Sequence, residues 1–133
     1  MAKSSSFSSC GQTILRIVVG VIFLIHGWQK IHAIGFHGVA GMFGQIGIPL
    51  PTITAAIVIL VEFLGGIALI LGLATRPAAL LLAIDMAGAI FFVHFKNGFY
   101  VNHGGYEFAL SLLAACLALA LNGGGALAID SLI

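Results

Sequence analysis

Four long apolar runs constrain the fold of this chain more than any other feature of its sequence. They cover about residues 14–31, 53–74, 78–95 and 105–122, with polar, glycine-containing or proline-containing segments between them. A bilayer core about 30 Å thick is crossed by about 20 helical residues at 1.5 Å each. Only 7% of the 133 residues are charged, too few to cover a water-soluble fold with polar side chains. The runs therefore predict an all-α integral membrane protein, a four-helix bundle that crosses a lipid bilayer.

The segments outside the runs predict a tail and a tight hairpin. Residues 1–12 contain five serines and are expected to form a flexible N-terminal tail, which leaves residues 13–133 as a single membrane domain. Thr75, Arg76 and Pro77 separate the second and third runs, and proline is well tolerated in the first turn of a helix. The second and third spans are therefore expected to form a hairpin.

The longest connector, residues 32–52, predicts a short interfacial helix between the first two spans. Val39, Met42, Phe43 and Ile46 recur at helical spacing, so they would share one face of a helix lying along the membrane surface. Glycine and proline just beyond Ile46 would end it.

The basic residues give the chain a weak orientation. Lys3, Arg16 and Arg76 fall on the side of the two termini, and Lys30 and Lys96 fall on the opposite side, the far end of the bundle. Since cytoplasmic segments carry the excess of lysine and arginine, three against two predicts that both termini are cytoplasmic.

Titratable side chains inside a membrane span are costly unless they pair or line a cavity, so they mark candidate sites. Six of them fall in the half of the bundle near the far end, and four spans contribute: His26, Lys30, Glu62, Asp85, His94 and Glu107. Small residues share the helix faces of Glu62 and Glu107, which favours an inward direction for both carboxylates. Asp85 and His94 are nine residues apart, about half a turn out of phase, so they cannot face the same neighbour. We interpret the set as a polar ligand-binding pocket.

Purely structural interpretations of the deeper residues stay open. Glu62 can pair with Lys30 or Arg16 and only neutralise charge. His26 can likewise hydrogen-bond to Glu62 without any ligand. The case for a pocket depends on the convergence of several residues rather than on one of them.

The residues nearer the membrane surfaces have structural interpretations as well. His94 can be interfacial, and Glu107 can interact favourably with the N-terminus of its own helix. Arg16 and Arg76 are expected to extend their guanidinium groups to lipid headgroups, and with Asp130 they form a set of structural or interfacial charges.

Several functional classes have no support in the sequence. A net charge of +1 offers no basic field for nucleic acid. The five histidines and two cysteines form no compact metal-binding spacing, so no metal site is predicted. A haem held by His26 and His94 is an alternative that the sequence disfavours, although bundles can place axial ligands on facing helices.

The order of several short motifs resembles the DoxX family over about residues 12–131. The motifs that carry the resemblance are Arg16, Gly20, Phe23, Gly27, Lys30, Gly47, Pro49, Glu62, Gly65, Gly66, Leu69, Gly72, Arg76, Asn97-Gly98-Phe99, Tyr106-Glu107, Gly123-Gly124-Gly125 and Ile129-Asp130. The resemblance implies a four-helix protein of the bacterial inner membrane, in a family linked to quinol oxidation and to thiol-redox partners.

The leading hypothesis is a small membrane redox subunit with a quinone or quinol pocket, not catalytic alone. His26 or Glu62 would hydrogen-bond to a quinone oxygen, and Lys30 would be an entrance charge. Glu107 or His94 would connect the pocket to bulk water. Because no side chain here carries electrons, an electron-donor protein or complex subunit is an expected partner, and a homo-oligomer is a further option.

Two other classes of function stay open. One is a non-catalytic membrane anchor or assembly partner for a redox or stress-response complex. The other is a small proton-linked transporter, for which four spans are few unless the chain oligomerises.

Overall fold

The computed structural model describes the backbone of residues 2–133 and the side chains of residues 7–133. Its regular elements are all helical, and these residues contain no β-strand. In chain order the elements are α1 (Ala2–Gln29), η1 (Lys30–Ile34), α2 (Phe36–Gln45), α3 (Pro51–Leu71), α4 (Thr75–Ala89), η2 (Ile90–His94), η3 (Phe95–Asn97), η4 (Val101–His103), α5 (Glu107–Asn122) and η5 (Ile129–Leu132). The all-α prediction is confirmed.

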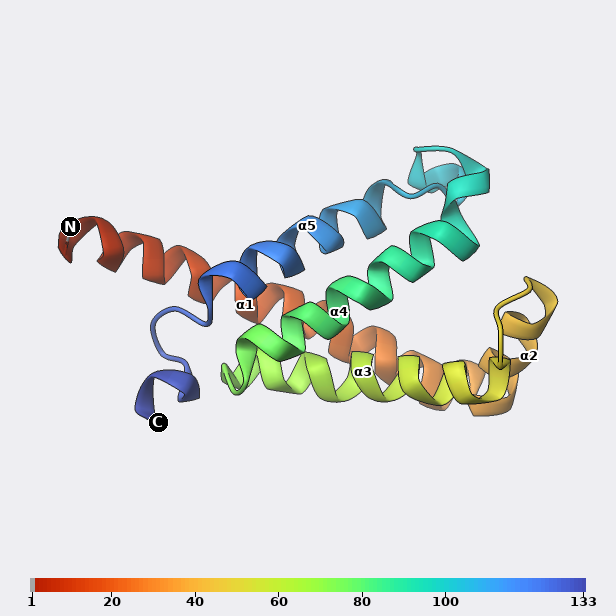
Figure 1. Cartoon of the computed structure of the whole chain (residues 1–133), viewed down its shortest axis with the longest axis horizontal. Coiled ribbons are helices and arrows are strands. Elements are labelled where there is room, and N and C mark those ends of the chain that lie inside the picture. The colour runs from red at the N-terminus through yellow and green to blue at the C-terminus, as the bar shows by residue number, and fades with distance from the viewer. Residues whose placement is uncertain (1) are drawn as a thin grey trace.

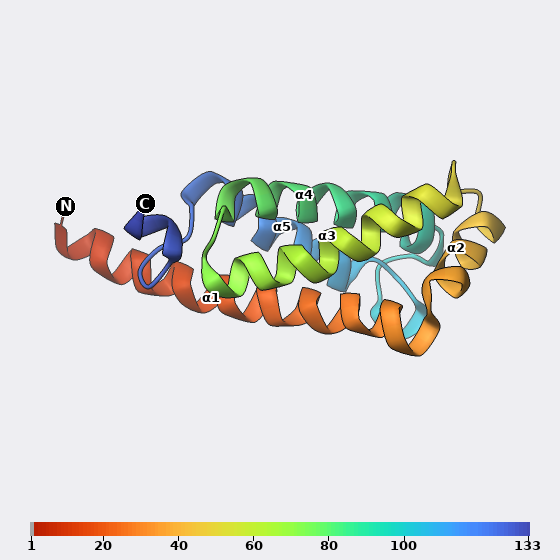
Figure 2. The ribbon, with the colours of Figure 1, turned by 90° about the horizontal axis from the view of Figure 1, so that it is seen from below.

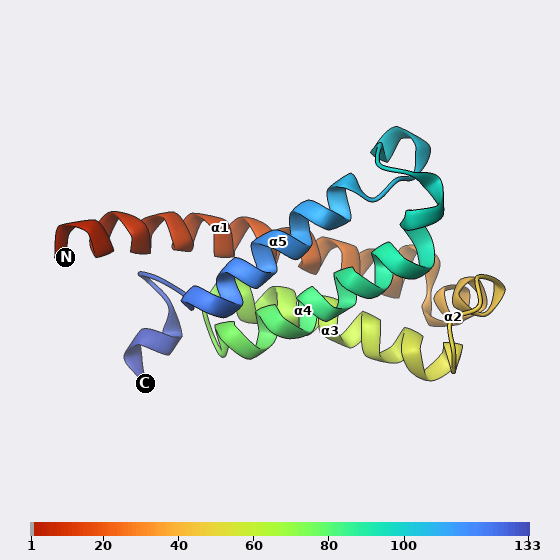
Figure 3. The same cartoon turned by 45° about the horizontal axis from the view of Figure 1, so that its top comes forward.

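The four long helices form a bundle built from two pairs. Helix α1 packs most extensively against α3, and α4 packs most extensively against α5, while α3 and α4 join the pairs through a tight hairpin (Figures 1 and 2). Both termini lie at one end of the bundle, and α2 and the α4–α5 loop lie at the far end (Figures 1 and 3).

The helices differ in how well they match a bilayer. Among the described residues, three continuous helices are long and apolar enough to cross a membrane: Phe7–Ile34, Pro51–Leu71 and Thr75–Asn97. Helix α5 has 16 residues, about 24 Å, which is shorter than the hydrocarbon core. The predicted fourth span corresponds to α5, which is apolar but short and begins at Glu107, two residues later than expected.

Glycines allow α1 and α3 to touch backbone to backbone. A Cβ atom at Gly66 would lie 2.5 Å from the backbone nitrogen of Leu24, and one at Gly27 would lie 2.6 Å from that of Phe63. Only a residue without a side chain permits these approaches, as is common where membrane helices cross. The close crossing fixes which residues of α1 face α3.

The connector contains the predicted short helix, α2, but fewer of its apolar side chains are buried than expected. Val39 and Phe43, one turn apart, are buried against Ala55 and Ile59 of α3. Met42 is 50% exposed because it lies about 100° away around the helix.

The first residues of the chain differ from the expected flexible tail. Helix α1 begins at Ala2 and runs without interruption into the first span. The Thr13 hydroxyl donates to the carbonyl of Ala126, and the Ala126 N–H donates to the carbonyl of Ser9 at 3.3 Å. The C-terminal segment thus packs along the first turns of α1, a contact between residues far apart in the sequence.

Candidate functional site

The best-formed polar contact in the bundle joins α1 to α3. Lys30 lies at the end of α1, where the chain changes to the π-helical turn η1, and Glu62 lies in the middle of α3. Lys30 Nζ donates to Glu62 Oε1 at 2.7 Å, and the two side chains are 21% and 4% exposed. The pair is one of the alternatives that the sequence left open.

Glu62 faces inward because of its neighbours on α3. Gly66, one turn later on the same face, packs against the backbone of α1, and Leu69 is fully buried in the core. The same helix face therefore directs the Glu62 carboxylate towards α1 and α4 rather than towards lipid.

Asp85 of α4 adds a second carboxyl group to this pair. It interacts with Glu62 at short range and with the charge of Lys30. Its Oδ2 atom is buried and has no hydrogen-bond partner among the described residues. Lys30, Glu62 and Asp85, here called the charge cluster, thus bring one cation and two carboxyl groups together from three helices.

The charge cluster is electrically neutral only when its two carboxyl groups hold one proton between them. One ammonium group cannot neutralise two carboxylates, and an uncompensated buried charge costs several kcal/mol. An unpartnered buried oxygen is also unusual, since nearly all buried polar atoms in folded proteins are hydrogen-bonded. The cluster can therefore accept a proton or a hydrogen-bonding ligand.

His94 and Glu107 do not join the cluster, although the sequence placed them in the same pocket. His94 Nδ1 lies 2.8 Å from the carbonyl oxygen of Gly104, and the backbone N–H of Val101 donates to Glu107 Oε1 at 2.9 Å. Both side chains therefore organise the loop between α4 and α5.

His26 lies near the cluster but is not bonded to it. It is half-buried on α1, one turn before Lys30, and its ring centroid lies 6.3 Å from that of Phe108 on α5. The hydrogen bond to Glu62 that the sequence suggested is not formed.

Arg16 departs most from its expected place at the lipid headgroups. It is fully buried, and its guanidinium group donates to carbonyl oxygens on both sides. The acceptors are Leu69 and Ile70 at the end of α3, each at 2.8 Å, and Gly124, Ala126 and Leu127 of the C-terminal segment, at 2.8, 3.3 and 3.4 Å. Arg16 therefore ties α1, α3 and the C-terminal segment together.

Asp130 has a related structural role. Its two carboxylate oxygens accept the backbone N–H groups of Ala74 and Thr75, at 2.6 and 2.8 Å, at the start of α4. Burial alone would raise the pKa of Asp130, but the hydrogen bonds from Thr75 and Ala74 and the nearby Arg16 charge outweigh it and hold the pKa below its usual range. Asp130 thus caps α4 from 55 residues away, a pairing without a local sequence signal.

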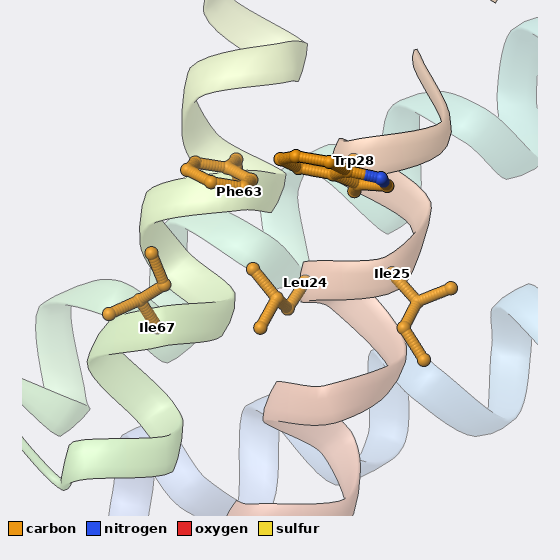
Figure 4. Close-up of a pocket in the computed structure, with 5 residues that line it drawn as sticks. All are labelled: Leu24, Ile25, Trp28, Phe63 and Ile67. Carbon is orange, nitrogen blue, oxygen red and sulfur yellow. The ribbon is translucent and has the colours of Figure 1, made fainter. Parts of the chain in front are cut away.

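An apolar groove of about 460 Å³ lies between α1 and α3 on the outside of the bundle. Its lining is entirely apolar: Leu24, Ile25, Trp28, Phe63 and Ile67 (Figure 4). The Trp28 and Phe63 rings are stacked, with centroids 6.2 Å apart. Since no polar atom is exposed inside it, the groove suits lipid chains rather than the chemistry of the charge cluster.

Metal binding finds no support in the geometry. Among the described residues, no group of three or more histidine, cysteine, aspartate or glutamate side chains is placed to hold a metal ion.

Comparisons with known proteins give a consistent result. The family model described as DoxX matches residues 11–95, which include all three residues of the charge cluster. "Putative oxidoreductase CatD" of Bacillus subtilis (strain 168) is 37% identical over 123 residues, covering 92% of this chain and 87% of the relative. Inner membrane protein YqjF of Escherichia coli (strain K12) is 33% identical over 126 residues, covering 92% of this chain and 92% of the relative. Inner membrane protein YphA of the same organism is 33% identical over 122 residues, covering 88% of this chain and 86% of the relative. No solved structure matches the chain.

Proposed function

The chain belongs to the DoxX family of membrane proteins, and from this membership we propose that it is a small redox-associated subunit that binds a quinone or quinol at Lys30, Glu62 and Asp85. One observation carries the proposal: a partly buried ion pair lies beside a buried carboxyl oxygen that has no partner among the described residues. A relative that bears the name of an oxidoreductase supports the redox assignment.

The charge cluster suits the polar end of such a ligand. A quinone carries two carbonyl oxygens, which accept hydrogen bonds, and the Lys30 ammonium has two further N–H donors besides the one given to Glu62. Lys30 is also the more exposed partner of the pair, so a ligand reaches the cluster from its side. His26, half-buried on α1 and one turn before Lys30, would contribute to the same pocket.

The cluster also supplies what quinone reduction needs from a protein. The conversion of a quinone to a quinol consumes two electrons and two protons. Glu62 and Asp85 balance the Lys30 charge when they share one proton between them, and that proton is available to a quinone oxygen. The second proton comes from water near the far end, and a partner protein with a redox group supplies both electrons.

Quinone binding to the purified protein tests this proposal. The dissociation constant of a soluble short-chain quinone is measured in detergent for the wild type, Asp85→Asn and Glu62→Gln. We expect both variants to bind at least about ten-fold more weakly, since hydrogen bonds to charged groups are worth about 1.5–3 kcal/mol each.

Glu107→Gln is the matched control. It removes one carboxylate of the same type, but from the α4–α5 loop, and it should leave the dissociation constant unchanged. Equal affinity in all four proteins would refute a quinone site at the charge cluster.

A further inference from the structure

Besides the apolar groove, a second pocket of about 430 Å³ lies at the end of the bundle where both termini are found, and it contains no residue of the charge cluster. The start of α4 forms one wall, and the C-terminal segment forms the other. The lining includes Thr75 and Arg76 on α4, and Asp130. It also includes Gly123, Gly124 and Gly125, which we call the glycine loop. We call this second pocket the terminal pocket.

The terminal pocket contains several hydrogen-bond donors. Thr75 is fully buried, and its hydroxyl forms no hydrogen bond of normal length in the part of the chain that the structure describes, although the Asp130 carboxylate lies within its reach. A Cβ atom at Gly124 would lie 2.9 Å from that hydroxyl, so the glycine is needed to keep the space open. The backbone N–H groups of Gly124 and Gly125 donate none of the backbone–backbone hydrogen bonds found among the described residues. A buried donor that is left unsatisfied costs about 1–3 kcal/mol, which a bound acceptor would recover.

Arg76 adds a cation to these donors. Its guanidinium group lies against the glycine loop, since a Cβ atom at Gly123 would be 3.2 Å from Arg76 Nε. No carboxylate among the described residues forms a salt bridge with it. A guanidinium group next to hydroxyl and amide donors is the arrangement that binds phosphate oxygens.

The carboxylate of Asp130 places a negative charge on the opposite wall of the terminal pocket, which the C-terminal segment forms. Its oxygens each accept one backbone N–H, and further lone pairs stay available. A simple anion would be repelled by this carboxylate, whereas a ligand with a phosphate and an ammonium group would match both walls.

The position of the terminal pocket indicates where such a ligand comes from. The 21 residues of α3 span about 31 Å, so the hairpin after Leu71 lies at the level of the lipid headgroups. We propose that the terminal pocket binds the headgroup of an amine-bearing phospholipid, with its phosphate at Arg76, Thr75 and Gly124 and its ammonium group at Asp130.

Titration of the delipidated full chain in detergent tests this proposal. Three probes are compared by calorimetry: short-chain phosphatidylethanolamine, short-chain phosphatidylglycerol and inorganic phosphate. We expect the ethanolamine lipid to bind most tightly, and Arg76→Gln to weaken it about ten-fold or more. Lys96→Gln removes the same charge from an exposed position at the far end and should have no effect.

The two walls of the pocket can be separated by further variants. Thr75→Val should weaken all phospholipid binding, while Asp130→Asn should remove the preference for the amine-bearing lipid. Arg76 is exposed, so Arg76→Gln keeps the test valid even if Thr75→Val fails to fold. Equal binding by Arg76→Gln and Lys96→Gln would overturn the proposal. So would inorganic phosphate that binds as tightly as the lipid, or phosphatidylglycerol that binds as tightly as phosphatidylethanolamine.

Discussion

Lys30 Nζ and Glu62 Oε1 lie 2.7 Å apart and join the far end of α1 to the middle of α3. The Glu62 side chain is buried, and the carboxyl group of Asp85 lies next to that of Glu62. The stability of this part of the bundle therefore depends on which of the three charges is present.

Removal of Lys30 should be the most damaging single change in the charge cluster. Lys30→Met leaves two carboxyl groups facing each other without a cation, and we expect the free energy of unfolding to fall by about 3 kcal/mol. Glu62→Leu should cost less, because Asp85 can then pair with Lys30. Unfolding in mixed micelles measures both values, and a larger loss in Glu62→Leu than in Lys30→Met would contradict the arrangement.

Replacement of Arg16 should release the C-terminal segment from the bundle. Arg16→Met removes five hydrogen bonds to carbonyl oxygens, three of them to residues 124–127. Arg16→Lys should rescue little, since an ammonium group has three donors and lacks the planar geometry of a guanidinium group. Limited proteolysis after residue 122 measures the release, and full protection of Arg16→Met would show that the segment is held by other contacts.

The sequence predicted the features that depend on composition and on local spacing. The apolar runs predicted the all-α membrane bundle, and the apolar positions Val39 and Phe43 predicted the short helix α2. Small residues on the Glu62 face likewise predicted its inward direction, because helix phase depends only on neighbours in the chain.

The sequence was less informative where a partner lies far away in the chain. Nothing near Arg16 indicates that its acceptors are 53 to 111 residues distant, so it was expected at the lipid headgroups. Nothing local pairs Asp130 with the start of α4. His94 was placed in the pocket by its depth, and Glu107 by its depth and the small residues on its helix face. Neither feature can show that a nearby loop binds both side chains.

Acid should weaken the cap that Asp130 provides to α4. The pKa of Asp130 is lower in the folded protein than its usual value of about 3.9, so the carboxylate stabilises the fold above that value. The contribution is lost as the pH falls through the lowered pKa. We expect Asp130→Asn to be less stable than the wild type at about pH 6 and equally stable once the pH lies well below the lowered pKa of Asp130. Thermal unfolding as a function of pH measures this, and a difference that persists in acid would exclude a role for the charge.

The glycine contacts between α1 and α3 should be sensitive to a single methyl group. A Cβ atom at Gly66 would lie 2.5 Å from the Leu24 backbone nitrogen, so Gly66→Ala forces the helices apart and should cost more than about 1 kcal/mol of unfolding free energy. The separation should also lengthen the contact between Lys30 and Glu62.

Gly88 provides the matched control, because it lies in α4 and a Cβ atom added there would meet no other atom within 4 Å. Gly88→Ala should stabilise the protein by about 0.5–1 kcal/mol, since alanine is the better residue inside a helix. The free energies of unfolding of both variants, measured in the same detergent, give the comparison. If Gly66→Ala were as stable as Gly88→Ala, the backbones of α1 and α3 could not be in contact at this point, and the alignment that brings Lys30 to Glu62 would have to arise elsewhere.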